Sequence, residues 1–126
     1  MQVPSDERSG TAMPQYRVIF QVAEPSPALH EAALRNIRNT VVDLGPDAEV
    51  ALVAHGAGIG LVTDETDFQD QVEDLVKQGV QVLACRNTIT RQQISEDRLL
   101  PRVEIVSSGI GEIVRRQQQG WAYVRP

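Results

Sequence analysis

The chain alternates short apolar runs with longer segments of helical periodicity, and this alternation most constrains its fold. The short runs are rich in β-branched residues and bounded by turn signals, which predicts strands at 16–22, 49–54, 80–84, 103–106 and 121–124. Between them, apolar residues recur at helical spacing, which predicts helices over 27–44, before Gly79, over 87–94 and over 109–119. Strands this apolar are covered on both faces. The pattern therefore predicts a three-layer α/β/α domain around a five-stranded, mainly parallel sheet.

The length of 126 residues fits one domain with one core. Residues 1–15 show no periodicity and are rich in proline, glycine, serine and charge, so we expect a flexible N-terminal tail. The domain itself is expected to span residues 16–126.

Composition excludes several classes of function. The net charge of −5 argues against a nucleic-acid partner or an anionic membrane surface, because phosphate binding needs a basic face. No apolar stretch approaches the length of a membrane span, and one cysteine cannot form an internal disulfide, so we expect a cytoplasmic protein. Two histidines and one cysteine lack metal-ligand spacing, so neither a metal site nor a cofactor is predicted.

Chemistry-bearing residues follow directly on several predicted strands. In a parallel sheet all strands end on one edge, and ligands bind in the crevice outside those ends. His55, Cys85, Ser107 and Ser108 are expected to gather on that edge.

Cys85 stands where a strand stops and a helix begins. A thiol there feels the positive end of the helix dipole, and the neighbouring Arg86 also favours the thiolate. Asn87 and Thr88 are suited to cap the helix, and their amides would hold the sulfur anion. Alternatively, Cys85 is a small buried hydrophobe that closes a core strand.

The segment from His55 to Gly60 carries three glycines. Its Gly-x-Gly-x-Gly spacing matches neither nucleotide-binding motif, so we expect a loop that bends around a small ligand or a neighbouring subunit. His55 is a candidate base, hydrogen-bond donor or cation beside Cys85, or a histidine satisfied by backbone groups. Ser108 and Gly109 form a helix start that could bind an anion, although a capping role is the simpler interpretation.

Three segments together resemble the DsrE/DsrF-like proteins, in particular their small single-domain branch. They are Ala84-Cys85-Arg86-Asn87-Thr88-Ile89, the pair His55-Gly56, and residues 108–124. The resemblance implies a five-stranded parallel sheet assembled as a trimer or hexamer. It also implies that Cys85 occupies the place of the cysteine that carries a persulfide in the sulfur-relay members. The Arg86-Asn87-Thr88 segment differs from the small-residue stretch of the relay subunits, so the donor and acceptor proteins stay unassigned.

Two functional hypotheses follow. In the first, the chain is a sulfur carrier or sulfurtransferase-like protein, with Cys85 as acceptor of sulfane sulfur and with His55, Gly56, residues 86–88, Ser108 and Gly109 binding around it. In the second, it is a non-catalytic oligomeric module that binds a small ligand or a protein, and Cys85 only packs. Trp121 and Tyr123 on the last strand are the expected contact surface in an oligomer.

Overall fold

The computed structural model describes residues 14–126, and most of the predicted N-terminal tail lies outside this range. Five strands form one sheet in the order β4-β3-β2-β1-β5, and every pair is parallel. The strands are β1 (Tyr16–Val22), β2 (Ala48–Ala54), β3 (Gln81–Cys85), β4 (Glu104–Val106) and β5 (Ala122–Val124). Because β1 and β5 are parallel neighbours, the described chain begins at the amino edge of the sheet and ends at its carboxyl edge.

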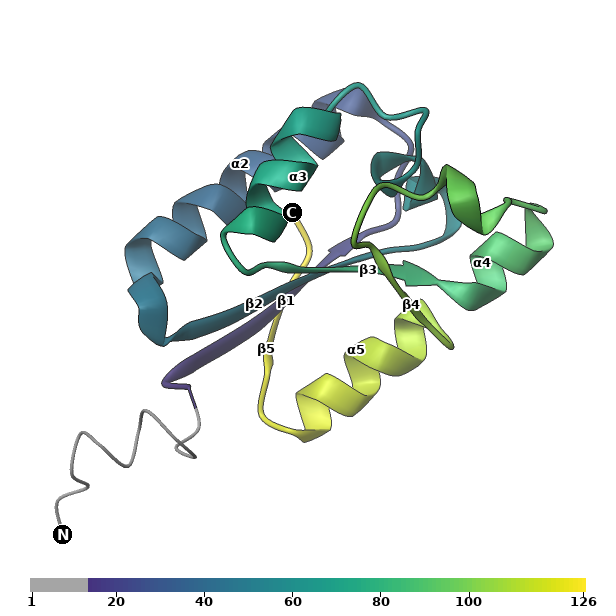
Figure 1. Ribbon diagram of the computed structural model, residues 1–126. Helices are drawn as coiled ribbons and strands as arrows, with labels where there is room; N and C mark the ends of the chain where they lie inside the picture. Colours follow the sequence, from purple (N-terminus) through teal and green to yellow (C-terminus); the bar gives the residue numbers. More distant parts are fainter. Residues whose placement is uncertain (1–13) are drawn as a thin grey trace, which may run out of the picture.

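Helices cover both faces of the sheet, as Figure 1 shows. Helices α2 (Pro27–Leu44) and α3 (Gln69–Lys77) lie on one face, and α5 (Gly109–Gln118) lies on the other. Shorter elements complete the connections: α4 (Arg86–Arg91) and the 3-10 helices η1 (Gly45–Asp47), η2 (Gly56–Val62) and η3 (Glu96–Arg98). The predicted three-layer α/β/α architecture is confirmed, and the sheet is parallel throughout.

Strand side chains alternate between two apolar cores of unequal size. The larger core packs β1, β2 and β3 against α2 and α3, and it includes Phe20, Leu52 and Val82. The smaller core packs the other strand faces against α5 and includes Val53 and Leu83. One face of the sheet is therefore covered by two helices and the other by α5.

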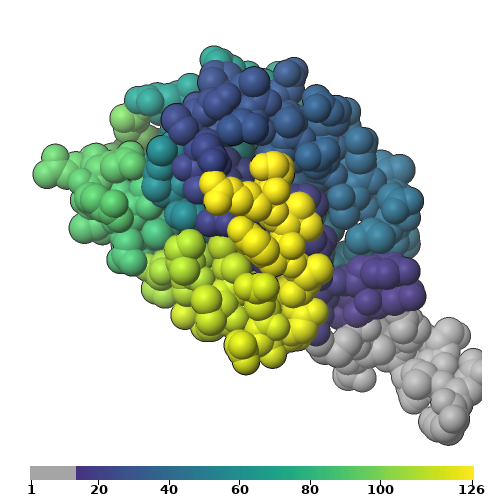
Figure 2. Space-filling view, turned by 180° about the vertical axis from the view of Figure 1, so that it is seen from behind, coloured from purple at the N-terminus to yellow at the C-terminus, as the bar shows by residue number. Residues whose placement is uncertain are grey.

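Helix α5 buries only part of its apolar surface. The sequence predicts Ile110, Ile113 and Val114 to face inward, but only Ile113 does so, while Ile110 and Val114 are 53% and 52% exposed. The prediction is wrong for two residues because, within the part of the chain that the structure describes, no other helix lies on this face to cover the outer side of α5. Figure 2 shows α5 beside β5 on this face of the molecule.

Trp121 is a core residue. Its ring is buried in the smaller core, and the Arg116 guanidinium lies 4.5 Å from the ring centroid. Of the two residues predicted to contact a second copy, Trp121 is therefore buried within the chain, and Tyr123 is partly exposed.

The glycine-rich segment after β2 is the 3-10 helix η2, and Leu61 and Val62 within it are fully buried. A Cβ atom at Gly58 would lie 2.5 Å from the carbonyl oxygen of Val22, so glycine is required there for close packing of η2 on β1. This packing explains Gly58 alone; that the segment bends around a small ligand or a neighbouring subunit stays a prediction. Within residues 14–126, no helix is long and apolar enough to cross a membrane.

Candidate functional site

The carboxyl edge of the sheet brings together side chains from three adjacent strands. Because side chains alternate along a strand, Gln21, His55 and Cys85 share the α5 side of the sheet with the core residues two positions before them. Gly109, the first residue of α5, lies against this row. A Cβ atom at Gly109 would be 2.9 Å from His55 Cβ and 3.4 Å from Cys85 Cβ, so His55 and Cys85 meet at this glycine.

Cys85 is the N-cap residue of α4 and is 5% exposed. Burial raises the pKa of its thiol, but hydrogen bonds from the Thr88 hydroxyl and from the backbone N–H groups of Gly109, Thr88 and Asn87 together lower that pKa below its ordinary value. The donors come from α4 and from the start of α5. The folded protein thus favours the thiolate at a position that is largely shielded from water.

Thr88 connects Cys85 to the glycine segment. The N–H of Gly56 donates to the Thr88 hydroxyl oxygen at 2.8 Å, which leaves the hydroxyl proton to donate to the sulfur. Gln92 in turn donates to the carbonyl of Gly56 at 3.1 Å. Thr88 is buried, so its hydroxyl is fixed between these two partners.

His55 is held by a side chain that the sequence did not indicate. Its Nε2 atom lies 2.7 Å from Nε2 of Gln21, and the Tyr123 hydroxyl donates to Oε1 of the same Gln21 side chain. Burial and then the positive charge of Arg125 lower the pKa of His55 below its ordinary value. His55 is therefore neutral near pH 7, so the structure disfavours a cationic role for it.

The other predicted site residues take different places. The Arg86 guanidinium is turned to Glu96, with Nη1 and Oε2 2.6 Å apart, and the groups that lower the pKa of Cys85 do not include it. Asn87 contributes its backbone N–H. Ser108 accepts a hydrogen bond from the N–H of Gly111 at 3.0 Å, which is the capping role.

Sequence reasoning missed Gln21 and the hydroxyl of Tyr123 as members of the site. One signal was available for Gln21, since it is the polar residue in an otherwise apolar strand end, on the same face as His55. Tyr123 could not be assigned without the pairing of β1 with β5.

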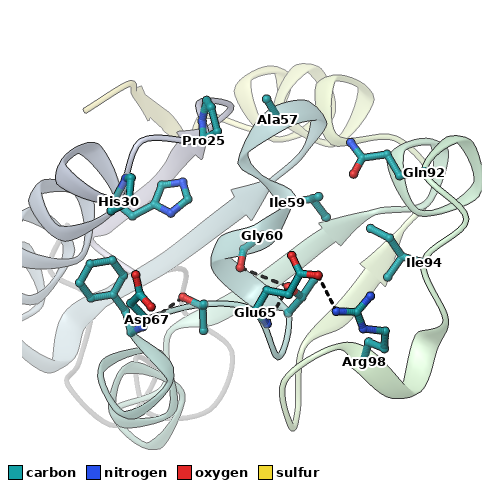
Figure 3. Close-up of a pocket in the computed structure, with 14 residues that line it drawn as sticks. Pro25, His30, Ala57, Ile59, Gly60, Glu65, Asp67, Gln92, Ile94 and Arg98 are labelled. Carbon is teal, nitrogen blue, oxygen red and sulfur yellow. Dashed lines mark hydrogen bonds and ion pairs between the residues drawn. The ribbon is translucent and has the colours of Figure 1, made fainter.

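A separate hollow of about 430 Å³ opens on the same edge of the sheet, and Figure 3 shows its lining. It lies between the start of α2, η2 and the segment after α4, and Cys85, His55 and Gly109 are not among its lining residues. The ion pair of Arg98 with Glu65 lies at its wall. Among residues 14–126, no cluster of three or more histidine, cysteine, aspartate or glutamate side chains could hold a metal ion.

Fold and site together define a class: a small parallel α/β protein with a thiolate-favouring cysteine at the carboxyl edge of its sheet. The sequence matches the DsrE/DsrF-like family over residues 17–126. The chain belongs to this family.

Solved structures agree with this assignment. The MTH1491 protein of unknown function from Methanobacterium thermoautotrophicum is 37% identical, with a TM-score of 0.85 over 89% of this chain and 100% of that one. The YchN protein of E. coli shares the fold at 20% identity, with a TM-score of 0.70 over 89% of this chain and 99% of that one. No protein with a curated description matches the chain.

Proposed function

We propose that the protein is a sulfur carrier in which Cys85 accepts sulfane sulfur as a persulfide and passes it to a partner protein. The observation that carries this proposal is the set of hydrogen-bond donors around the Cys85 sulfur, which lower its pKa despite burial. Membership of a sulfur-relay-related family supports it.

The transfer is a pair of nucleophilic displacements. The Cys85 thiolate attacks the outer sulfur of a donor persulfide R–S–SH, a new S–S bond forms, and R–S⁻ leaves. Cys85 then carries the S–SH group. An acceptor thiolate attacks that outer sulfur, and Cys85 departs as the thiolate. No external oxidant is needed, since the sulfane sulfur only changes its partner.

Each site residue has its own role in this sulfur transfer. Thr88 and the N–H groups of Asn87 and Gly109 stabilise the anionic sulfur, and Gly56 fixes the Thr88 hydroxyl. His55 borders the sulfur across Gly109 and is available to contact the incoming sulfane group. Ser108 holds the start of α5, so that the Gly109 N–H stays directed at Cys85. With one cysteine in the chain, the acceptor thiol belongs to another molecule, and a reduced thiol of this kind suits the cytoplasm.

The proposal includes self-association as a trimer or hexamer. Ile110 and Val114 form an outward apolar row on α5, and the strand β5 beside it is exposed at the edge of the sheet. A second copy of the chain could cover this surface, which Figure 2 shows as one continuous face.

A binding module without sulfur chemistry is the second candidate, and one observation favours it: Cys85 is 5% exposed. In that case the hollow beside η2 would hold the ligand and Cys85 would only pack.

Mass spectrometry after incubation with a polysulfide donor separates the two candidates. We expect the intact protein to gain the mass of sulfur on Cys85, to lose it to an added thiol, and to gain nothing in a Cys85→Ser variant. An unmodified Cys85, under conditions in which a known persulfide carrier is loaded, would exclude the sulfur-carrier proposal and leave the binding module.

A further inference from the structure

Three polar side chains form a hydrogen-bonded row across the carboxyl edge of the sheet. Tyr123 comes from β5, Gln21 from β1 and His55 from the end of β2, and these strands are neighbours in the order β2-β1-β5. Gln21 is 9% exposed, so the central side chain of the row is buried. A buried polar group of this kind costs stability unless its partners satisfy it, and both ends of the Gln21 amide are satisfied here.

The hydrogen bonds determine which way the Gln21 amide is oriented. The Tyr123 hydroxyl donates to the amide oxygen of Gln21, so the amide nitrogen faces His55. An amide nitrogen only donates, and therefore Nε2 of His55 accepts and carries no proton. A neutral imidazole in this arrangement has its proton on Nδ1. Nδ1 is bonded to Cγ of the same ring. A Cβ atom built on Gly109 would lie 3.1 Å from this Cγ atom and 3.4 Å from Cβ of Cys85, so this side of the ring is near Cys85.

We propose that Tyr123 and Gln21 are positioning residues that hold His55 in the Nδ1–H form, so that it acts at Cys85 as a hydrogen-bond donor and not as a base. The inference rests on the proposed function in one respect: the group that receives the Nδ1–H bond is the outer sulfane sulfur on Cys85. In this arrangement Thr88 and the backbone N–H donors, and not His55, lower the pKa of the Cys85 thiol.

The second histidine supplies an internal reference. Nε2 of His30 lies 2.6 Å from the carbonyl oxygen of Glu24, and a carbonyl only accepts, so His30 carries its proton on Nε2. Nε2 is thus expected to be unprotonated in His55 and protonated in His30 in the same sample.

Nitrogen-15 NMR of the histidine rings at neutral pH tests the tautomers directly. We expect a pyridine-type signal from Nε2 of His55 and a pyrrole-type signal from Nε2 of His30, with the two rings assigned by the set of signals that is lost in His55→Asn. A pyrrole-type Nε2 in His55, matching His30, would mean that the Gln21 amide is reversed and would overturn the proposal.

Two variants test the row. In Gln21→Glu the ionised carboxylate can only accept a hydrogen bond, so we expect His55 to lose its pyridine-type Nε2 signal. The control Gln118→Glu, at an exposed residue, should keep that signal. In Tyr123→Phe the amide loses the partner that orients it, so we expect both tautomers at His55 and only one in Tyr16→Phe. An unchanged His55 spectrum in Gln21→Glu and Tyr123→Phe would overturn the positioning role.

Sulfur transfer from loaded Cys85 to an added thiol gives the functional measurement. We expect it to slow about two- to five-fold in Tyr123→Phe and not in Tyr16→Phe, as for the weakening of one hydrogen bond. If Tyr123→Phe shows both tautomers of His55 but transfers sulfur as fast as Tyr16→Phe, the sulfane sulfur does not receive the Nδ1–H hydrogen bond. Failure to load Cys85 at all would instead defeat the sulfur-carrier function and the named recipient, while the tautomer assignment would stand on its own spectrum.

Discussion

At Cys85, burial and hydrogen bonding act on the thiol in opposite directions. Burial raises its pKa, and donors from Thr88, Gly109 and Asn87 lower it by more. Thr88 is the side-chain donor in this group and also receives the Gly56 N–H, so one hydroxyl supports both the sulfur and the neighbouring loop. Thr88 is therefore the residue through which the ionisation of Cys85 is most readily altered.

Replacing Thr88 with valine should raise the pKa of the thiol, because a donor to the thiolate is lost at nearly constant shape. At pH 7 we expect alkylation of Cys85 to slow by about three- to ten-fold, the equivalent of one hydrogen bond. Thr88→Ser keeps the hydroxyl and should react like the natural protein. Thr90→Val, on the exposed side of the same helix, is the matched control. If Thr88→Val and Thr90→Val alkylate at the same rate, the hydroxyl has no role in ionisation.

Much of the immediate surroundings of Cys85 could be predicted from the sequence, because they are local. A strand end followed by helix-capping residues indicates amides near the sulfur, and the structure has the N–H groups of Asn87 and Thr88 there. The direction of Arg86 could not be predicted, since its partner Glu96 lies on η3, after the intervening turn. Gln21 and Tyr123 required the order of the strands, which alternation alone does not specify.

Among the elements, the strands were the most predictable and the glycine segment the least. The five expected strands are present to within a residue or two, because apolar runs bounded by turn residues are a local signal. The three glycines suggested a ligand loop, but a glycine required by packing and one required by a ligand look alike in sequence. Only the approach of η2 to the backbone of Val22 distinguishes them.

The packing of η2 can be tested by adding a single methyl group. Gly58→Ala would place a Cβ atom 2.5 Å from the Val22 carbonyl oxygen, so we expect the free energy of unfolding in urea to fall by about 1–3 kcal/mol. Gly60→Ala, in the same helix with nothing within 4 Å of the new Cβ, should leave it nearly unchanged. Equal stability of the two variants would show that η2 does not pack on β1 as described.

For the whole molecule, the main asymmetry is the coverage of the sheet. Two helices cover one face and, among residues 14–126, α5 is the only helix on the other, which leaves Ile110 and Val114 outside. The helical period placed Ile110 and Val114 on the apolar side of α5 and so predicted that they would be covered. It could not show whether the cover comes from this chain or from another copy, since both arrangements need the same pattern.

The proposed trimer or hexamer can be tested by placing a charge on this surface. Val114→Asp should shift the protein toward monomer in light scattering coupled to gel filtration, because an unpaired carboxylate would be buried between copies. Val42→Asp introduces the same charge on α2 at a valine that is 75% exposed, and it should keep the natural assembly. A natural protein that is monomeric at all concentrations would remove self-association from the proposal.

The pH dependence of Cys85 alkylation, compared between the folded and the urea-unfolded chain, tests the central claim most directly. The chain has one cysteine, so the rate reports that thiol alone. Because the folded structure lowers the pKa of Cys85, the account predicts that the folded protein reaches half-maximal reactivity at a lower pH than the unfolded chain. A folded-state midpoint equal to or above that of the unfolded chain, or a thiol that reacts only after unfolding, would contradict the account.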